Sequence, residues 1–211
     1  MLNIKKVCVV TGSRADYGHL STLMRHIQKD NDLTLQIVAT GTHYSPFHGM
    51  TYLEIEKDEF QIDQKVDILL ANDSPNAITK SLGLALIGFS EAFERLKPDM
   101  IVLLGDRFEI LAAAQCAMLS NIPISHIHGG EVTEGSVDNS IRHAITKMSH
   151  LHFVATEIYA QRVIQMGEDP NKVFNCGAPG LDSISLTPLY SKEELEKILD
   201  FKFHDKIFLI T

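Results

Sequence analysis

The sequence predicts an α/β fold, a Rossmann-like, doubly wound parallel sheet. Short apolar runs alternate along the chain with segments whose apolar residues recur at helical spacing. Glycine-containing turns follow several of the apolar runs directly, which is typical of strands that lead into helices. Right-handed crossovers between parallel strands place helices on both faces of such a sheet.

The first half of the chain predicts two strands and two helices. Val7–Val10 is a short β-branched run, as expected of a strand that is buried on both faces. Ser74-Pro75 predicts an N-cap followed by proline at the first helical position. In order, we expect a strand at 7–10, a helix at 17–29, a strand at 33–39, a loop at 41–49 and a helix from 75 to 97.

The second half repeats the alternation more densely. Met100–Leu104 is uninterruptedly apolar, and Phe108–Leu119 consists almost entirely of alanine and apolar residues, so both are expected to be buried. In order, we expect a strand at 100–104, a helix at 108–119, a strand at 122–127, a helix at 140–149, a strand at 151–155, a helix at 158–166 and a strand at 173–175.

The end of the chain differs from the rest. A linker is expected around Leu186-Thr187-Pro188, followed by a polar helix with Ser191 as N-cap and Glu194 completing a capping box. An apolar β-run at 206–211 then stops at the last residue. We therefore expect one Rossmann-like domain over 1–185, and over 186–211 a linker and the start of a truncated second domain.

The composition of the 211 residues argues against some classes of partner. A net charge of -8 disfavours nucleic acid and acidic membranes, because phosphates are repelled, although a local pocket can still bind a phosphorylated small ligand. The three cysteines form no CxxC pair and are expected to be free, buried thiols. There is no signal-peptide pattern and no apolar stretch of roughly 18 residues. We expect a cytoplasmic protein.

Ligands bind open parallel sheets beyond the carboxyl ends of the strands. The first predicted strand leads to Gly12-Ser13-Arg14 and Asp16, which does not match GxGxxG and disfavours a nicotinamide cofactor. A Gly-Ser turn that opens a helix can bind an anion, and Arg14 can add a charge-assisted bond. The alternative is a tight turn with a solvated Arg14. His43, after the second strand, is either a ligand contact or an ordinary loop histidine.

Two later strands lead to acids. Asp106 and Arg107 follow the strand at 100–104, where Asp106 is an acid, a base or a sugar ligand, or else a helix cap or a partner of Arg107. The densest cluster follows the next strand: His126, His128, Glu131, Glu134, Asp138, Arg142 and His143. Paired carboxylates beside histidines suit proton transfer, with one acid as base and the other as proton donor.

A metal site and a serine triad are disfavoured in this cluster. A strand directs His126 and His128 to the same face, but Glu131 lies beyond a Gly-Gly turn and no zinc-type spacing is met. No GxSxG elbow is present. Asp138 or Ser140 can cap the following helix. Arg142 in its first turn opposes the helix dipole, a local conflict that is typical of functional sites.

The combined motifs resemble the hydrolysing UDP-N-acetylglucosamine 2-epimerases. TGSRADYG, GTH, SLGLAL, LLGDRFE, HIHGGEVTEG, DNSIRHAITKMSHLHF and NCGAPGLD occur in this order over nearly all of residues 5–185. The resemblance implies a two-domain GT-B-like fold, no cofactor, and a dimer formed through the N-terminal domain. It implies C2 proton abstraction and anti elimination of UDP, giving 2-acetamidoglucal, to which water adds to release N-acetylmannosamine.

The resemblance also implies roles for individual residues. Asp106 and Asp138 correspond to the acids nearest the chemistry, with Glu131 and His128 as further catalytic candidates. The residues expected to bind substrate are Arg14, Asp16, His43, Arg107, His126, Arg142 and His143.

Two features depart from the sialic-acid branch of the family. His128 stands where that branch has glutamate, and HIHGGEVTEG is more similar to members acting on UDP-2,4-diacetamido-trideoxy sugars of legionaminic acid synthesis. Both substrates therefore stay open. Family members also continue into a second domain that carries most UDP contacts, so these 211 residues alone are expected to bind UDP-sugar weakly and turn it over little. A glycosyltransferase half-domain and a catalytically silent binding module are the alternatives.

Overall fold

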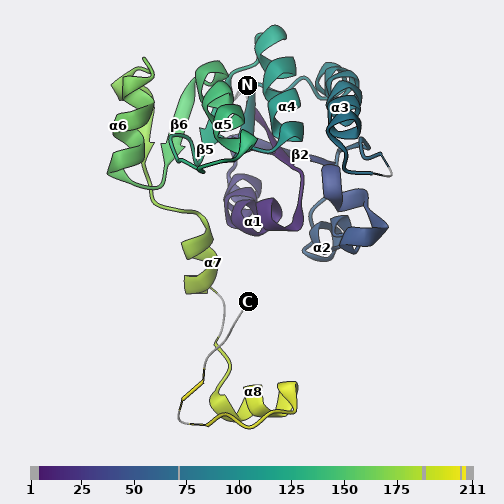
Figure 1. Ribbon diagram of the computed structural model, residues 1–211, viewed down its shortest axis with the longest axis vertical. Coiled ribbons are helices and arrows are strands. Elements are labelled where there is room, and N and C mark those ends of the chain that lie inside the picture. The colour runs from purple at the N-terminus through teal and green to yellow at the C-terminus, as the bar shows by residue number, and fades with distance from the viewer. Residues whose placement is uncertain (1–4, 71, 187–188, 205, 208–211) are drawn as a thin grey trace.

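The computed structural model describes residues 5–70, 72–186, 189–204 and 206–207, and it confirms the predicted fold class. The strands form one parallel sheet flanked by helices (Figure 1). This sheet has seven strands in the order β3-β2-β1-β4-β5-β6-β7. The chain runs outward from β1 through β2 to β3, crosses to β4, and then runs in the opposite direction. The strands are β1 Lys5–Thr11, β2 Leu33–Thr40, β3 Gln64–Val66, β4 Met100–Leu104, β5 Ile124–Ile127, β6 Leu151–Val154 and β7 Val173–Asn175.

Helices cover both faces of the sheet, as the right-handed crossovers predict. Alternate residues of β1 face opposite ways: Val9 packs with Met24 of α1, whereas Val10 packs in the cluster that contains Phe89 of α3 and Ile145 of α5. The helices are α1 Arg14–Lys29, α2 Tyr52–Lys57, α3 Pro75–Leu96, α4 Phe108–Leu119, α5 Val137–Met148, α6 Glu157–Gln165, α7 Gly180–Leu186 and α8 Lys192–Leu199.

Three predicted element boundaries shift for identifiable reasons. α1 begins at Arg14, three residues early, because the Ser13 side chain caps it by accepting the Asp16 N–H. β5 begins at Ile124, directly after Pro123, because proline cannot donate to a sheet ladder. α5 begins at Val137, since Ser136 is its N-cap. Neither Asp138 nor Ser140 caps this helix.

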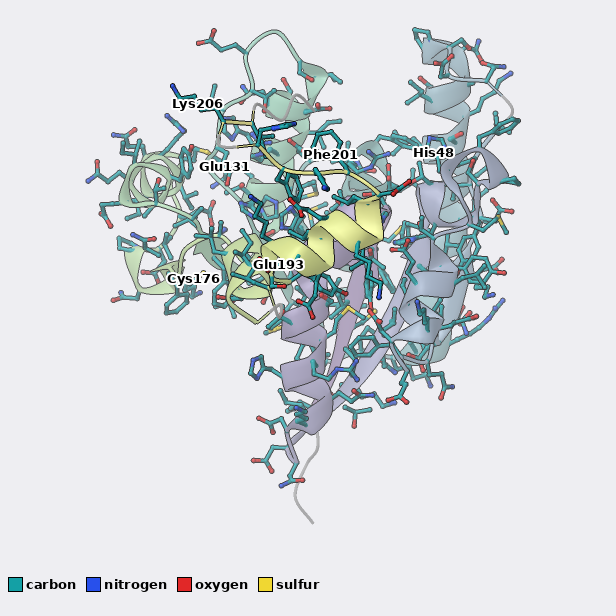
Figure 2. All side chains as sticks on the ribbon, turned by 90° about the horizontal axis from the view of Figure 1, so that it is seen from below. His48, Glu131, Cys176, Glu193, Phe201 and Lys206 are labelled. Carbon is teal, nitrogen blue, oxygen red and sulfur yellow. The ribbon has the colours of Figure 1, made fainter. Side chains whose placement is uncertain are left out.

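Several elements were not expected from the sequence. α2, β3 and α7 are short, and β3 is a three-residue edge strand with a polar pattern. The expected loop at 41–49 forms two 3-10 turns, η1 at Gly41–Tyr44 and η2 at Pro46–His48. A third, η3, spans Pro170–Lys172. Cys8 and Cys116 are buried as expected, but Cys176 is exposed after β7 (Figure 2).

The C-terminal segment lies apart from the sheet. α7 packs on α1, and α8 lies beyond it (Figure 1), in the foreground when the molecule is seen from below (Figure 2). The capping box of Ser191 and Glu194 is confirmed. Thr187 and Pro188 of the expected linker, and 208–211 of the expected terminal strand, lie outside the described residues. In the part of the chain that the structure describes, no helix is long and apolar enough to cross a membrane.

Candidate active site

The loops that follow β1, β2, β4 and β5 meet at the carboxyl edge of the sheet. These four strands are consecutive in the sheet, and the direction of the chain reverses between β1 and β4. Crevices at such reversal points are where open α/β sheets bind ligands. A cavity of about 510 Å³ opens here, and Asp106, Arg107 and Asp138 lie in its wall. The structure therefore brings together residues that the sequence places more than thirty positions apart.

Asp106 forms an ion pair with Arg142 of α5. Arg142 Nη2 donates to Asp106 Oδ2, while Arg142 Nη1 donates to Thr133 Oγ1 at 3.3 Å. Partial burial raises the pKa of Asp106 above its ordinary value; Arg142 opposes this, and the negative charges of Asp138 and Glu131 reinforce it. Arg142 thus holds one oxygen of the Asp106 carboxyl group within a group of acids.

The alternative structural roles of Asp106 are not found. α4 has Arg107 as its N-cap residue, with no side-chain capping bond, so Asp106 does not cap it. Arg107 pairs with Glu109 rather than with Asp106, at 2.5 Å between Arg107 Nε and Glu109 Oε1.

His128 and Glu131 form a second pair in the loop after β5. His128 Nδ1 and Glu131 Oε1 are 2.5 Å apart. Burial alone raises a carboxyl pKa, but the hydrogen bond and charge of His128, together with Arg142, hold the pKa of Glu131 below its ordinary value. The environments of Asp106 and Glu131 therefore shift their pKa values in opposite directions, the arrangement expected of a proton donor and a base.

The expectation that His126 and His128 share one face is wrong. β5 ends at Ile127, and His128 adopts the left-handed conformation with φ of +64°, which turns the chain. His126 contacts Thr146 of α5, whereas the His128 ring lies edge-on to His19 of α1, with centroids 5.9 Å apart. The two histidines point toward helices on opposite sides of the sheet.

His126 and His43 lie in the interior rather than at the ligand edge. His126 is fully buried, with Nδ1 bonded to Thr146 Oγ1 at 3.1 Å and Nε2 to the Gly105 carbonyl at 2.8 Å. His43 is also fully buried, with its two nitrogens 2.9 Å from the hydroxyl groups of Thr11 and Thr51. Burial lowers the pKa of each histidine to about 4. In this geometry both are neutral and tie loops to the sheet rather than present a nitrogen to a ligand.

In the turn after β1, the Asp16 side chain accepts a backbone N–H that the sequence analysis expects a bound anion to accept. Asp16 is buried, and its Oδ2 accepts the N–H of Gly12 at 3.2 Å. That N–H is therefore not available to the anion expected at this turn. Burial raises the pKa of Asp16, opposed by its bond with Ser13 and the charge of Arg107. Arg14 is exposed and pairs with Glu54 of α2 at 3.2 Å, as in the alternative of a solvated side chain.

His143 lies on the partly covered face of α5. Its Nδ1 is buried and has no hydrogen-bond partner among the described residues. Burial and the charges of Arg142 and Arg162 lower the pKa of His143. Of the expected histidine ligands, His143 has the unpartnered nitrogen.

Glu109 is a central acid of the site that the sequence analysis missed. It is fully buried in the first turn of α4, and its Oε2 has no hydrogen-bond partner among the residues that the structure describes. A Cβ atom built on Gly12 or Gly41 would lie 2.7 Å or 2.9 Å from Glu109 Oε1. The carboxyl group thus packs against the backbone of the loops after β1 and β2 and orients Arg107 of the loop after β4. The sequence signal that could have indicated Glu109 is that it is the single acid in an alanine-rich, apolar helix.

Replacing Glu109 with glutamine is expected to change how stability depends on pH. Burial raises the pKa of Glu109 above its unfolded value of about 4.3, against the opposing charge of Arg107. The folded state then holds the proton to higher pH, so the Glu109 carboxyl group destabilises it progressively as pH rises through this window. Thermal melts should show Glu109→Gln gaining stability over the unmodified chain as pH rises above about 4.3.

A charge control separates this effect from a general loss of negative charge. Glu91→Gln removes one carboxylate from the exposed surface of α3, where Glu91 pairs with Arg95. A pH trend of Glu109→Gln equal to that of Glu91→Gln, or of opposite sign, contradicts the assignment of a raised pKa to Glu109.

A metal centre finds no support in the geometry. No group of three or more His, Cys, Asp and Glu side chains within residues 5–70, 72–186, 189–204 and 206–207 is arranged to hold a metal ion.

The fold and the clustered acids define the chain as a Rossmann-like domain with a group of acidic and basic side chains at the switch point of its sheet. The family profile described as UDP-N-acetylglucosamine 2-epimerase matches residues 25–211. The chain belongs to this family.

Its relatives are consistently longer than this chain. This chain is 50% identical over 207 residues to "GDP/UDP-N,N'-diacetylbacillosamine 2-epimerase (hydrolyzing)" of Campylobacter jejuni. The match covers 98% of this chain and 54% of that protein. The chain is 43% identical to the corresponding UDP-N,N'-diacetylbacillosamine enzyme of Legionella pneumophila, covering 98% and 55%. The chain thus spans about half the length of these curated relatives.

Solved structures carry the same fold. The UDP-GlcNAc 2-epimerase of Neisseria meningitidis bound to UDP-GlcNAc matches with a TM-score of 0.76 and 23% identity, over 92% of this chain and 51% of that one. A second crystal structure of a UDP-N-acetylglucosamine 2-epimerase matches with a TM-score of 0.80 and 19% identity, over 92% and 54%. At these identities the likeness establishes the architecture alone.

Proposed function

We propose that these residues form the N-terminal half of a hydrolysing UDP-2-acetamido-sugar 2-epimerase. Family membership supports the reaction class, and the Asp106–Arg142 and His128–Glu131 pairs support acid–base chemistry at this site. In this proposal 1–185 is one domain, and 186–211 leads into a second domain that closes the site and holds UDP. "Full-length protein" below means the chain together with that domain.

The proposed reaction has two steps. A base removes the proton at C2, the electron pair forms a C1–C2 double bond, and the C1–O bond breaks as UDP leaves on the opposite face. Water then adds to the 2-acetamidoglucal, with hydroxyl going to C1 and a proton to the face of C2 that inverts its configuration. The products are UDP and the 2-epimeric free sugar.

One observation carries the assignment of acids to these steps. The pKa of Asp106 is raised and that of Glu131 is lowered, although both lie near Arg142. The raised pKa of Asp106 favours proton donation by this residue, and the lowered pKa of Glu131 favours proton abstraction. Asp138 and His128 complete the proposed catalytic group. Arg107 and Arg142 supply positive charge, and Arg14, Asp16 and His143 are further proposed substrate contacts.

The family name and the relatives leave two substrates for the proposal. UDP-GlcNAc, giving N-acetylmannosamine for sialic acid synthesis, is the first. UDP-2,4-diacetamido-2,4,6-trideoxyglucose, for legionaminic acid synthesis, is the second, and the names of the Campylobacter and Legionella relatives favour it. Cytoplasmic placement stays a prediction from the sequence.

We also propose that two copies associate through this domain. α3 buries Ser81, Ala85 and Phe89 in the core, as expected, yet it leaves Leu84 and Ile87 44% and 63% exposed. Such an apolar strip on a helix that is already buried on its other face suits contact with a second copy.

Proton NMR in deuterated water tests the epimerase function. The full-length protein is incubated with UDP-GlcNAc and, separately, with the diacetamido substrate. Release of UDP together with the 2-epimeric sugar carrying deuterium at C2 is expected with at least one of them. Release of UDP only when an acceptor sugar is added indicates a glycosyltransferase, and no turnover of either substrate indicates a silent binding module.

A further inference from the structure

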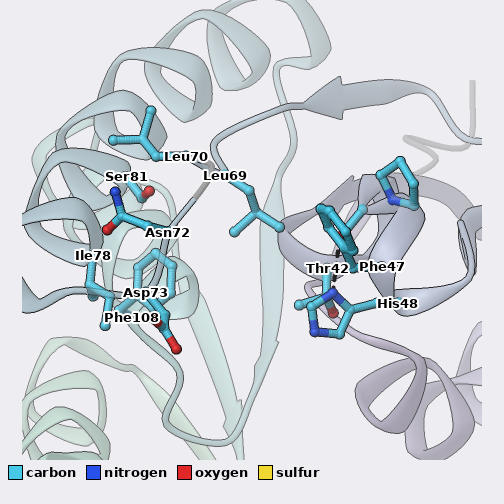
Figure 3. A pocket seen from close by; sticks show the side chains of 12 residues that line it. Thr42, Phe47, His48, Leu69, Leu70, Asn72, Asp73, Ile78, Ser81 and Phe108 are labelled. Carbon is cyan, nitrogen blue, oxygen red and sulfur yellow. Dashed lines mark hydrogen bonds between the residues drawn. The ribbon is translucent and has the colours of Figure 1, made fainter.

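A second cavity, drawn in Figure 3, has lining residues in common with the cavity that contains Asp106 and Asp138. Its volume is about 600 Å³, within the range of small-molecule sites. The 3-10 turns after β2 form one wall, with Phe47 and His48. The loop after β3 and the start of α3 form the other, with Leu70, Asn72 and Ile78.

The two cavities share a wall. Ile78 and Phe108 line both the 600 Å³ cavity and the 510 Å³ cavity that contains Asp106 and Asp138. Phe108 lies two residues after Asp106 in the chain, so this shared wall begins close to that acid in sequence. A sugar whose reacting carbon lies at Asp106 can extend a neighbouring substituent past Phe108 into the second cavity.

The chemistry of the second cavity excludes a phosphate. No lysine or arginine lies among its lining residues, and Asp73 adds a negative charge. Its surface is instead rich in apolar side chains that face open space: Phe47 is 96% exposed, Leu70 39% and Ile78 40%. Apolar side chains gathered around one cavity favour an occupant that carries methyl or acyl groups.

The polar groups of the cavity match an amide. Asn72 Oδ1 accepts the backbone N–H of Ser74 at 3.1 Å, which fixes the side chain and leaves its amide nitrogen as a donor. Ser81 adds a hydroxyl group deep in the wall. An acylamino substituent offers one carbonyl, one N–H and one methyl group. Bare sugar hydroxyl groups would instead lie against the apolar walls without hydrogen-bond partners.

We propose that this cavity is the subsite for the second acylamino group and the adjoining methyl group of a 2,4-diacylamino-6-deoxy sugar. Phe47, Leu70 and Asn72 are its specificity-determining residues. The assignment rests on the proposed epimerase function and selects the diacylamino sugar over the plain N-acetylhexosamine.

Substrate discrimination by cavity variants tests this subsite in the full-length protein. Leu70→Trp fills the cavity, and Phe47→Ala removes one of its walls at a position where the side chain is 96% exposed. Each should lower kcat/KM for UDP-2,4-diacetamido-2,4,6-trideoxyglucose at least about tenfold, while kcat/KM for UDP-GlcNAc changes less than about twofold. Met118→Trp is the matched control, since Met118 is 43% exposed on α4 and lines neither cavity.

The outcomes separate the subsite from the reaction. Equal losses on both substrates, no loss on either, or turnover of UDP-GlcNAc alone by the unmodified protein overturns the subsite and leaves the epimerase function standing. If the unmodified protein turns over neither sugar, the epimerase function fails and the subsite fails with it.

Discussion

Asp106→Asn in the full-length protein is expected to lower the epimerase rate by about 10²–10⁴-fold, the usual contribution of a general acid or base. Asparagine keeps the size of the side chain and one oxygen that can accept from Arg142, but it cannot release or take up a proton. The rate of UDP release, followed alongside NMR detection of the sugar, measures the effect.

A buried aspartate away from the site controls for this substitution. Asp63 is also partly buried with a raised pKa, and its Oδ2 accepts the Ile37 N–H at 2.7 Å. Asp63→Asn should change the rate less than about twofold. A loss below about tenfold for Asp106→Asn refutes a proton-transfer role for Asp106.

Gly41→Ala is expected to destabilise the domain by about 2–4 kcal/mol. Gly41 has φ of +58°, where an alanine costs about 1 kcal/mol. An added Cβ would also lie 2.7 Å from the Gly12 carbonyl oxygen and 2.9 Å from Glu109 Oε1, and such overpacking typically costs about 1–3 kcal/mol. For a domain of this size the melting temperature should fall by roughly 5–15 °C.

Gly49 separates backbone strain from crowding. It has φ of +82°, but nothing lies within 4 Å of a Cβ added there. Gly49→Ala should therefore lower the melting temperature by only a few degrees, about 2–4 °C. Equal shifts for the two variants, measured by circular dichroism, would show that the Gly12–Gly41–Glu109 contact contributes no packing constraint.

The sequence predicted the elements whose signals are local and strong. β4 and α4 have the predicted bounds because the apolar run ends at Gly105 and the alanine-rich segment is flanked by Arg107 and Ser120. The acids after β4 and β5 were found because residues that follow buried strands reach one edge of a parallel sheet. The sequence did not predict the short elements α2 and β3. These elements are stabilised by tertiary contacts of Ile55 and Val66 with the core, which no local pattern indicates.

The fine geometry of the site depends on contacts that no local pattern reveals. His128 separates from His126 because His128 is left-handed, and the buried His43 lies within hydrogen-bond distance of the hydroxyl groups of Thr11, at the end of β1, and Thr51, before α2. Glu109 acquires its importance only when two glycines from other loops approach it. These are properties of the folded packing, so sequence spacing indicates the neighbourhood of the site but not the direction of each side chain.

The position of β1 in the sheet has a consequence for how the chain folds. β1 pairs with β2 over residues 33–39, but its other edge is closed only by β4, whose partners are residues 100–102. Contacts this distant in sequence form slowly. During synthesis one edge of β1 therefore keeps its backbone N–H and C=O groups unpaired until more than a hundred residues have left the ribosome. Chains whose synthesis stops between residues 40 and 100 should aggregate through this edge.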